Sequence, residues 1–326
     1  MSTVLVTGAS GFVGSYVIPE LVGAGHHVVA LVRDDRAAAK VTARLDADRA
    51  RGVSFRVGDP VAGSGLQEAL AGVDAVVHLV AIPRDRDGGR SLLRVNLGGT
   101  TTMLQAAATA GTRRFVHLGA MGVEDDPDLH YATSKARAEK AVRESGLDWT
   151  ILKPSLLWGP RDGFFNIVAD LVRISPLVVP VPGSGKARFQ PLAVADLAIC
   201  ARMALEEPRT IGQAIELGGP RHWTYREITR EVLAGMRRSR RIVPMPVPLI
   251  TAVAGAAELV RLPFPVATDQ LRQLRLDNVG ALDGFYRAFG FVPRSMEGQL
   301  HYLRAKKRDQ DPATAKPPAA GRRAAS

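Results

Sequence analysis

The sequence predicts an α/β fold in which helices cover both faces of a doubly wound parallel sheet, followed by a smaller C-terminal α/β lobe. Apolar runs of strand length alternate with helical patterns through residues 1–155, which implies right-handed crossovers between parallel strands. The 326 residues suffice for a sizeable core, and the 46% hydrophobic and 23% charged residues match the usage of globular proteins. The third observation is a glycine-rich turn directly behind the first apolar run.

Six apolar runs of the first part are the predicted strands, at residues 4–7, 28–32, 53–57, 75–80, 115–118 and 149–152. The predicted helices between them lie near residues 12–24, 67–71, 91–110 and 131–145. After Pro154 prolines become frequent, and the expected elements are helices near 164–174, 192–206 and 224–236 and a strand near 213–217. We expect residues 1–155 to form one domain and residues 156–303 a smaller substrate lobe packed on it. Whether the strand near 213–217 rejoins the main sheet is left open.

The formal charge of +11 is unevenly distributed along the chain. Residues 304–326 hold seven Lys or Arg and two Asp, a net +5, which leaves +6 for the other 303 residues. That diluted charge shows neither aromatic interleaving nor a basic helix, so no specific nucleic-acid partner is predicted. We expect residues 304–326 to be a disordered basic tail, with attraction to anionic lipid or nucleic acid as the alternative.

Residues 242–257 carry no charge, which raises the question of a membrane span. Spanning a bilayer takes about 20 apolar residues, and the prolines at 244, 246 and 248 would break a helix here. No transmembrane span is therefore predicted, and residues 249–262 are expected to form an apolar helix packed on the body or lying on a membrane surface. The single cysteine, Cys200, is expected to be buried, and the N-terminus lacks the features of a secretory signal. A cytoplasmic protein is favoured, with a peripheral membrane position left open.

The segment VTGASGFVG, Val6–Gly14, places three glycines at intervals of three residues between a strand and a helix. Gly8 permits the tight turn, Gly11 removes a side chain where backbone must approach a pyrophosphate, and Gly14 lets helix and sheet pack closely. The helix N-terminus offers free N–H groups and a partial positive charge to the phosphates. The motif therefore predicts a Rossmann dinucleotide site, with a purely structural turn as the alternative. The other loop residues assigned to the cofactor are Ser10, Phe12 and Val13.

The second predicted strand ends without an acidic residue and continues into Arg33. NAD-preferring sites carry an Asp or Glu here for the ribose 2′-hydroxyl, whereas an arginine can clasp a 2′-phosphate. NADP(H) is therefore favoured over NAD(H), the alternative being an exposed Arg33 with Asp34 or Asp35 bending back to the ribose. Further cofactor residues are assigned from their places behind the third and fourth strands: Asp59, Val80 and Ala81.

The candidate catalytic pair is Tyr131 and Lys135, four residues apart at the start of a predicted helix and therefore on one face. A nearby cation stabilises a phenolate and lowers the tyrosine pKa from about 10 toward useful acid or base behaviour. Such a pair is suited to moving a proton on a hydroxyl or carbonyl while a nicotinamide moves a hydride. Chance occurrence of the spacing is the alternative.

These motifs resemble the extended and atypical short-chain dehydrogenase/reductases. The resemblance rests on TGASGFVG at 7–14, Asp59, Asn96 in VNLGGT and YATSK at 131–135. Within that superfamily, RFVHLGA at 114–120, ILKPSLLWGP at 151–160, FFN at 164–166, RFQPLAVADLA at 188–198 and ELGGP at 216–220 are similar to the group around the nucleotide-binding accessory subunit of respiratory complex I. The resemblance covers residues 3–300 or so and leaves out the tail.

The resemblance implies that Tyr131 is the general acid/base and that Lys135 holds the nicotinamide ribose. It further implies that Asn96, Pro154 and Ser155 flank the nicotinamide end. Active members usually carry a Ser or Thr after the fifth strand to hydrogen-bond the substrate oxygen, whereas this chain has LGAM at 118–121. The candidates to supply a replacement are Ser155, Ser134 and His117.

Two functions follow from these expectations. The first is a reductase, dehydrogenase or epimerase that uses NADP(H) on the hydroxyl or carbonyl of a small or lipophilic substrate. The second is a non-catalytic NADPH-binding subunit that stabilises or assembles a larger, respiratory-type complex, favoured by the missing hydroxyl at 118–121. A nucleic-acid or membrane-surface binder acting through the tail is the weakest reading, and no metal site is predicted.

Overall fold

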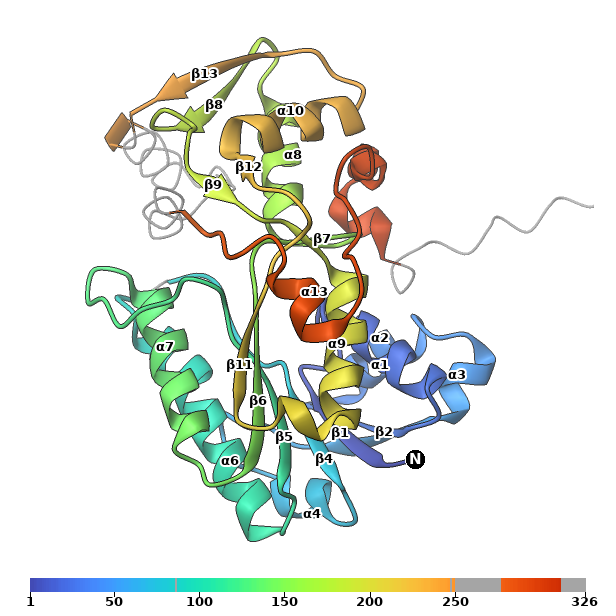
Figure 1. Ribbon diagram of the computed structural model, residues 1–326. Coiled ribbons are helices and arrows are strands. Elements are labelled where there is room, and N and C mark those ends of the chain that lie inside the picture. The colour runs from blue at the N-terminus through green and yellow to red at the C-terminus, as the bar shows by residue number, and fades with distance from the viewer. Residues whose placement is uncertain (86, 247, 250–276, 312–326) are drawn as a thin grey trace, which may run out of the picture.

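A computed structural model describes residues 1–85, 87–246, 248–249 and 277–311. Seven parallel strands form the main sheet in the order β11-β6-β5-β4-β1-β2-β3 (Figure 1). Their bounds are β1 Thr3–Thr7, β2 His27–Val32, β3 Val53–Val57, β4 Ala75–His78, β5 Arg114–Leu118, β6 Asp148–Pro154 and β11 Gln213–Leu217. The strand near 213–217 rejoins this sheet, because β11 pairs in parallel with β6 from Gln213 beside Thr150 to Leu217 beside Pro154.

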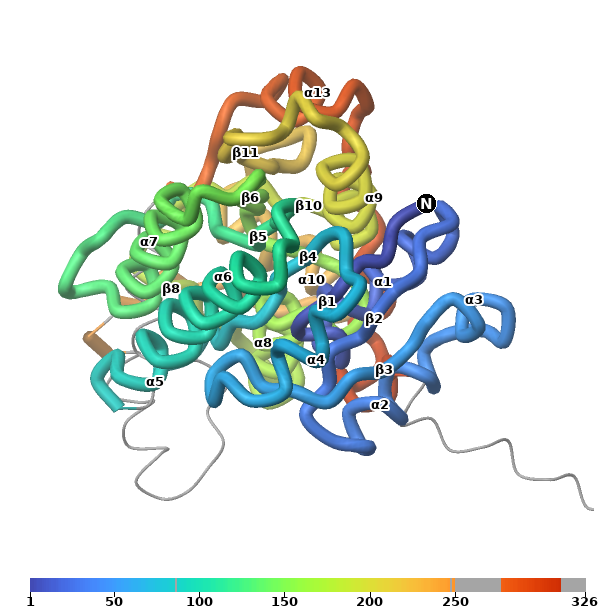
Figure 2. The backbone as a smooth tube through the Cα atoms, turned by 90° about the horizontal axis from the view of Figure 1, so that it is seen from below, coloured from blue at the N-terminus to red at the C-terminus, as the bar shows by residue number. Residues whose placement is uncertain are grey.

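The two faces of the sheet are covered by different helices, as Figure 2 shows from below. Helices α1 (Gly14–Gly23) and α9 (Val194–Glu206) pack on one face, and α4 (Leu66–Leu70), α6 (Gly99–Thr109) and α7 (His130–Arg143) on the other. Side chains of a strand alternate between the faces, so Val4 and Val6 of β1 join the first core while Leu5 joins the second. The predicted doubly wound parallel sheet is confirmed.

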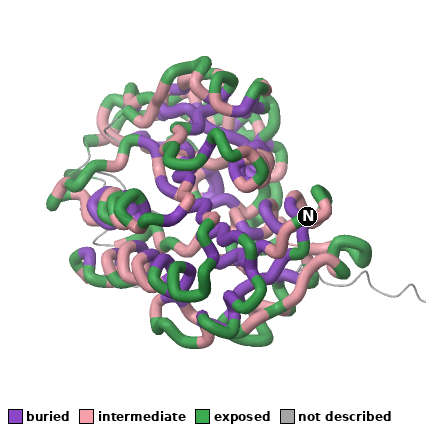
Figure 3. Tube along the Cα trace, turned by 60° about the horizontal axis from the view of Figure 1, so that its bottom comes forward, coloured by how far each residue is buried: buried purple, intermediate pink, exposed green. Residues whose placement is uncertain are grey.

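A third core lies above this sheet in Figure 1, built by the second half of the chain. Helix α10 (Tyr225–Gly235) begins with a capping box, in which Thr224 and Glu227 satisfy each other's backbone N–H groups. This core also contains helix α8 (Phe164–Ile174) and the short strands β7 (Leu157–Trp158), β8 (Val178–Pro182), β9 (Arg188–Phe189), β10 (Leu192–Ala193), β12 (Trp223–Thr224) and β13 (Arg241–Met245). Helix α13 (Gly284–Phe289) packs instead on the first core, through Phe285 and Phe289. Buried segments run through both parts in Figure 3.

Several boundaries differ from the sequence expectation. The fourth strand ends at His78 rather than at residue 80, and the helix expected at 91–110 is divided into α5 (Arg90–Leu92), a π-helical turn (Leu93–Gly98) and α6. Helices α2 (Asp35–Thr42) and α3 (Ala47–Arg51) were not expected. They are capped by Asp34 and Asp46, but α2 buries one residue and α3 none, so the apolar periodicity that identifies a helix is missing.

The start of the expected disordered tail is wrong for residues 304–311. These residues fold back onto the body, with a 3₁₀ turn at Lys307–Gln310, because Gln310 and Asp311 find buried polar partners there. Residues 312–326 and nearly all of the apolar stretch expected at 249–262 lie outside the described residues. Within the described part, none of the helices combines the length and the apolar character that crossing a membrane requires. Cys200 is fully buried in α9, as predicted.

Candidate functional site

A cleft of about 1610 Å³ lies between the carboxyl ends of the main strands and the second half of the chain. Its walls come from the glycine loop, the segments that follow β2 to β6, helix α8 and the C-terminal segment. Parallel sheets bind their ligands at this edge. The sequence-predicted residues that line the cleft are Gly8, Ser10, Gly11, Phe12, Val13, Gly14, Arg33, Asp59, Val80, Ala81, Tyr131, Pro154 and Ser155.

The glycine loop has no space for side chains at its three glycines. Gly8 has φ 67°, and a β-carbon there would lie 3.1 Å from the carbonyl carbon of Leu79. A β-carbon on Gly14 would lie 2.6 Å from the carbonyl oxygens of Gly8 and Ala9, and one on Gly11 would lie 3.0 Å from the former. Helix α1 behind the loop has neither a side-chain cap nor an acidic residue in its first turn. Its N-terminal N–H groups and partial positive charge therefore fit a phosphate.

The end of β2 fits a second phosphate. Arg33 is exposed and lines the cleft, whereas Asp34 accepts the backbone N–H of Ala37 at 2.8 Å and caps α2. This capping role opposes the alternative in which Asp34 bends back to a ribose. Asp59 is half-buried at the cleft wall, and its Oδ1 accepts the backbone N–H of Val61 at 2.8 Å.

Asn96 lies behind the cleft wall rather than in it. Its side chain is 1% exposed, accepts the backbone N–H of Ile82 at 2.8 Å and donates to the carbonyl of the same residue at 3.1 Å. A further bond from Asn96 Nδ2 reaches Ser134 Oγ at 2.9 Å, and Ser134 Oγ donates to the carbonyl of Tyr131. The structure thus places Asn96 where it ties the segment after β4 to α7.

Helix α7 directs Tyr131 and Lys135 to different places. Tyr131 is half-buried and lines the cleft, whereas Lys135 is 2% exposed and its Nζ donates to the carbonyl of Leu118 at the end of β5. Burial raises the pKa of Tyr131 to about 12, and the Glu139 carboxylate adds to the rise. Burial lowers the pKa of Lys135 to about 8 against the opposing effect of Glu139. The expected lowering of the tyrosine pKa by the lysine is therefore absent, because desolvation dominates.

Glu139 explains why the turn after β5 carries no hydroxyl at its first position. Its Oε1 accepts the backbone N–H of Ala120 at 3.2 Å, and its Oε2 lies 3.3 Å from Lys153 Nζ. A β-carbon on Gly119 would lie 2.6 Å from Glu139 Oε1 and 2.9 Å from a methyl carbon of Ile151. A serine at 119 would therefore displace the carboxylate. In the sequence, Glu139 follows Lys135 by four residues and is therefore expected on the same face of the helix. Nothing else in the sequence indicates its role.

Of the three candidates for a replacement hydroxyl, Ser155 alone lines the cleft. Ser134 is fully buried and already bonded to Asn96 and α7, and His117 is 1% exposed. Ser155 Oγ donates to Asn278 at its backbone carbonyl, 3.0 Å, and at its Oδ1, 2.5 Å. Asn278 Nδ2 in turn donates to the carbonyl of Met121 at 2.6 Å. Asn278 lines the cleft but carried no sequence motif that could have identified it.

His117 and His78 form a buried pair of rings between the strands and α7. The rings are stacked with centroids 5.7 Å apart, and His78 bonds to Thr7 Oγ1 at 2.9 Å and Thr100 Oγ1 at 3.2 Å. Burial lowers the pKa of His78 to about 3 and that of His117 well below its usual range, with Lys135 adding to both shifts. Both rings are therefore neutral near pH 7. Neither nitrogen of His117 has a hydrogen-bond partner among the described residues.

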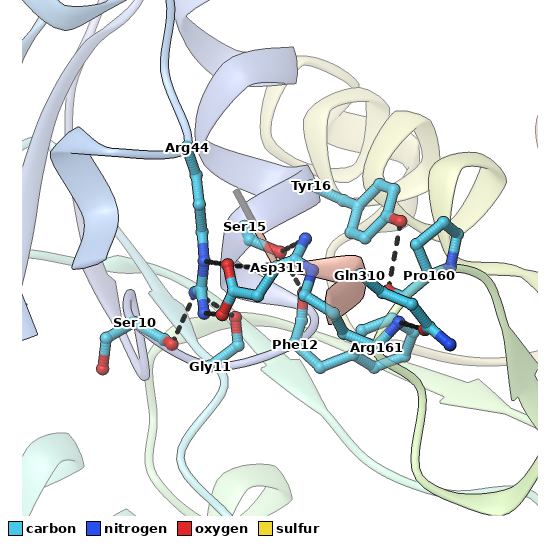
Figure 4. A network of polar contacts seen from close by, with 10 residues as sticks. All are labelled: Ser10, Gly11, Phe12, Ser15, Tyr16, Arg44, Pro160, Arg161, Gln310 and Asp311. Carbon is cyan, nitrogen blue, oxygen red and sulfur yellow. Dashed lines mark hydrogen bonds and ion pairs between the residues drawn. The ribbon is translucent and has the colours of Figure 1, made fainter. Parts of the chain in front are cut away.

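Arg161 is a cleft-lining residue that the sequence analysis did not single out. Its Nη2 donates to Ser15 Oγ in the first turn of α1 at 2.7 Å, and its guanidinium carbon lies 5.7 Å from the Tyr16 ring centroid. Figure 4 shows it beside the glycine loop with Arg44 and Asp311. Lys306 and Lys307 of the C-terminal segment line the same cleft. These residues reach the cleft through contacts between segments far apart in the sequence. No local sequence pattern could therefore have predicted their position.

Comparison with known proteins agrees with this geometry. A sequence family described as NAD(P)H-binding matches residues 8–169. The chain is 30% identical to a Streptomyces griseus protein named (4-alkanoyl-5-oxo-2,5-dihydrofuran-3-yl)methyl phosphate reductase, over 85% of this chain and 88% of that one. It is 26% identical to NADH dehydrogenase [ubiquinone] 1 alpha subcomplex subunit 9 of Arabidopsis thaliana, over 85% of this chain and 68% of that one. The fold is similar to Escherichia coli quinone oxidoreductase QOR2, with a TM-score of 0.71 at 20% identity, covering 92% and 99% of the two chains.

Proposed function

Because the chain belongs to the NAD(P)-binding, epimerase/dehydratase-like short-chain dehydrogenase/reductases, we propose that it is a reductase that takes NADPH and acts on a carbonyl group. The observation that carries the proposal is the position of Tyr131 on the wall of the cleft that holds the glycine loop. The broader class of reactions that Tyr131 and Lys135 would suit includes dehydrogenation and epimerisation at a hydroxyl or carbonyl. The parts of residues 156–303 that build the third core are proposed as the substrate lobe, whereas α9 and β11 belong with the main sheet.

The protonated state of Tyr131 fits the reductive direction of the reaction. Its pKa of about 12 keeps the phenol protonated near neutral pH, which is the form that donates a proton. When bound, reduced nicotinamide supplies a hydride to the carbonyl carbon. Tyr131 gives its proton to the carbonyl oxygen that receives the bond's electron pair. Ser155 and Asn278, which are bonded to each other and line the cleft, are proposed to orient the substrate oxygen.

The cofactor preference is proposed as NADPH. Arg33 is exposed at the cleft where a 2′-phosphate would lie, and Asp34, the acidic residue next to it, is committed to capping α2. The E. coli neighbour of similar fold is titled as a complex with NADPH. The substrate is proposed as a small or lipophilic carbonyl compound, and the S. griseus relative, named for reducing a phosphate ester, supports a reductive direction.

The test is Tyr131→Phe, assayed by loss of reduced nicotinamide with a panel of ketones, quinones and carbonyl phosphate esters. General acid catalysis contributes about 100- to 10,000-fold, so the variant should lose turnover by that factor and keep its NADPH affinity. Tyr286→Phe, at a 56% exposed tyrosine of α13, is the matched control and should retain turnover. Equal turnover by wild type and Tyr131→Phe would remove Tyr131 from the mechanism.

A second candidate is a non-catalytic NADPH-binding subunit of a larger assembly. It is favoured by one observation, that the turn after β5 lacks a hydroxyl and is backed by Glu139 at Gly119. Losing an oxyanion-type donor costs about 2.7 to 4 kcal/mol of barrier unless another group replaces it. The A. thaliana relative, named as a subunit of NADH dehydrogenase, supports association with a protein complex. Slow release of NADPH and no oxidation of it by any substrate in the panel would favour this function.

A further inference from the structure

Arg161 has unused hydrogen-bonding capacity next to the start of helix α1. Its Nη2 donates to Ser15 Oγ at 2.7 Å, and that hydroxyl donates to the carbonyl of Phe12 in the glycine loop at 2.6 Å. Arg161 Nε and Nη1 are buried and have no hydrogen-bond partner among the described residues. Arg161 Nη1 forms an ion pair with Asp311 Oδ1 at 3.8 Å, a separation too long for a hydrogen bond. Buried guanidinium hydrogens without acceptors cost free energy, so an anionic acceptor at this place would remove a penalty.

The backbone of Arg161 is also held in an unfavourable conformation. Its φ of 74° lies in the left-handed region, which non-glycine residues rarely adopt. The conformation is fixed from outside, because the N–H of Arg161 donates to Gln310 Oε1 at 2.6 Å. Gln310 is itself fixed by its Nε2, which donates to Asn166 Oδ1 at 2.9 Å. Strained residues that persist under such support are concentrated at functional sites.

The C-terminal segment joins this arginine to the glycine loop (Figure 4). Asp311 accepts two hydrogen bonds from Arg44, at Nε with 2.9 Å and at Nη2 with 2.6 Å. Arg44 Nη1 donates to the carbonyl of Ser10 at 2.7 Å, so the pair supports the loop from outside the cleft. Asp311 thus lies between two arginines whose side chains are 10% and 12% exposed.

Lys307 brings a second positive charge to the same region. It lines the cleft, and burial lowers its pKa, with Arg84 and Arg161 adding to the lowering and Asp162 and Asp170 opposing it. Together with Arg84, which also lines the cleft, Arg161 and Lys307 make three cations from distant parts of the sequence that act on one another there. Like charges repel, and their convergence in a cleft is the arrangement that clamps a multiply charged phosphate ligand.

We propose that Arg161 and Lys307 bind the pyrophosphate of the dinucleotide, and that the segment Lys306–Asp311 is the third wall of the cofactor site, with the glycine loop and β2 as the other two. The proposal rests on NAD(P)H binding and not on turnover. Asp311 serves as the counter-ion that keeps Arg44 and Arg161 together beside the loop.

The test measures the Kd of NADPH and of NADH by equilibrium titration of the full-length chain. Each charge-assisted hydrogen bond accounts for about ten- to a hundredfold in affinity, so Arg161→Gln should weaken both dinucleotides by that factor and by the same ratio. Lys307→Gln should weaken both about fivefold or more. Arg308→Gln is its matched control, since Arg308 lies in the same 3₁₀ turn, carries the same charge and does not line the described cleft. It should change neither Kd by more than about twofold. Arg33→Ala is the comparator and should weaken NADPH alone.

A second variant of the strained residue guards against a folding artefact. Arg161→Gly removes the same side chain but suits a φ of 74°, so it should match the affinity loss of Arg161→Gln at an equal or higher melting temperature. If Lys307→Gln and Arg308→Gln change the Kd values by the same factor, Lys306–Asp311 is not a wall of the cofactor site. Weakening of NADPH without NADH by Arg161→Gln would move that residue to the 2′-phosphate and overturn its pyrophosphate role. Unchanged dinucleotide affinity with altered inhibition by an anionic substrate analogue would assign both cations to the substrate. Because all readouts are binding constants, they are independent of whether Tyr131 supports turnover.

Discussion

The steric fit of the glycine loop gives a prediction whose size can be worked from the structure. In Gly14→Ala the new β-carbon would lie 2.6 Å from the carbonyl oxygens of Gly8 and Ala9, where ordinary contact begins at 3.4 Å. Backbone on both sides must therefore separate by the difference, 0.8 Å. Forced shifts of this kind in packed regions cost about 1–3 kcal/mol.

Gly23→Ala is the matched control, because it makes the same change in the same helix. Nothing lies within 4 Å of a β-carbon at Gly23. Alanine is favoured over glycine in a helix by about 0.5–1 kcal/mol, so Gly23→Ala should be neutral or stabilising. That helix preference acts on both variants, and their difference in unfolding free energy isolates the steric cost of about 1–3 kcal/mol.

Two assays check the prediction. Thermal unfolding should place Gly14→Ala below Gly23→Ala by about 1.5 °C per kcal/mol, because the unfolding entropy of about 2.1 cal/mol/K per residue is summed over the whole chain. Titration with NADPH should show a loss for Gly14→Ala only, because a displaced loop no longer aims its N–H groups at the phosphates. Hydrogen bonds to charged groups are worth about 1.5–3 kcal/mol each, so the loss should exceed about tenfold. If Gly14→Ala melts and binds like Gly23→Ala, the loop is not sterically determined and the reasoning fails.

Two further predictions concern the polar groups beneath the cleft. His78 and His117 are neutral in the fold and protonate in the unfolded chain, so the unfolded state binds more protons and stability falls as the pH drops below about 6.5, by up to about 1.4 kcal/mol per pH unit for each ring. His117→Phe should remove the contribution of one histidine to this pH dependence. The free energy of urea unfolding should then fall less steeply as the pH drops. An unchanged slope would contradict a buried, neutral His117. Glu139→Gln leaves the half-buried Lys153 without its counter-ion and should cost at most about 3–5 kcal/mol, while the tyrosine absorbance titration of Tyr131 should shift to lower pH. A variant as stable as wild type, with an unshifted titration, would show that Glu139 does not control this region.

The sequence carried the parts of the fold that depend on short-range patterns. The alternation of apolar runs and helical patterns predicted the doubly wound sheet, and the glycines of Val6–Gly14 predicted the turn that φ 67° at Gly8 now shows. Helices α2 and α3 were not predicted, because they bury almost nothing and periodicity identifies a helix only through its buried face. The folding of residues 304–311 onto the body was not predicted, because their composition is that of a solvated tail. Only specific partners, such as Arg44 for Asp311, hold them in place.

The features of the site can be separated in the same way, into those that depend on local sequence and those that depend on tertiary packing. The sequence by itself determined which residue types share one face or one loop: the glycines at the helix start, Arg33 after the second strand, and Tyr131 one turn from Lys135. Tertiary structure alone decided that Lys135 meets the carbonyl of Leu118, and that Asn278 meets Ser155 across 123 residues of chain. It also decided the pKa of Tyr131, because desolvation and the Glu139 charge depend on what surrounds the side chain rather than on spacing. Backbone periodicity is local and is recorded in the sequence, whereas burial and charge are summed over the whole fold and become definite only when the chain has packed.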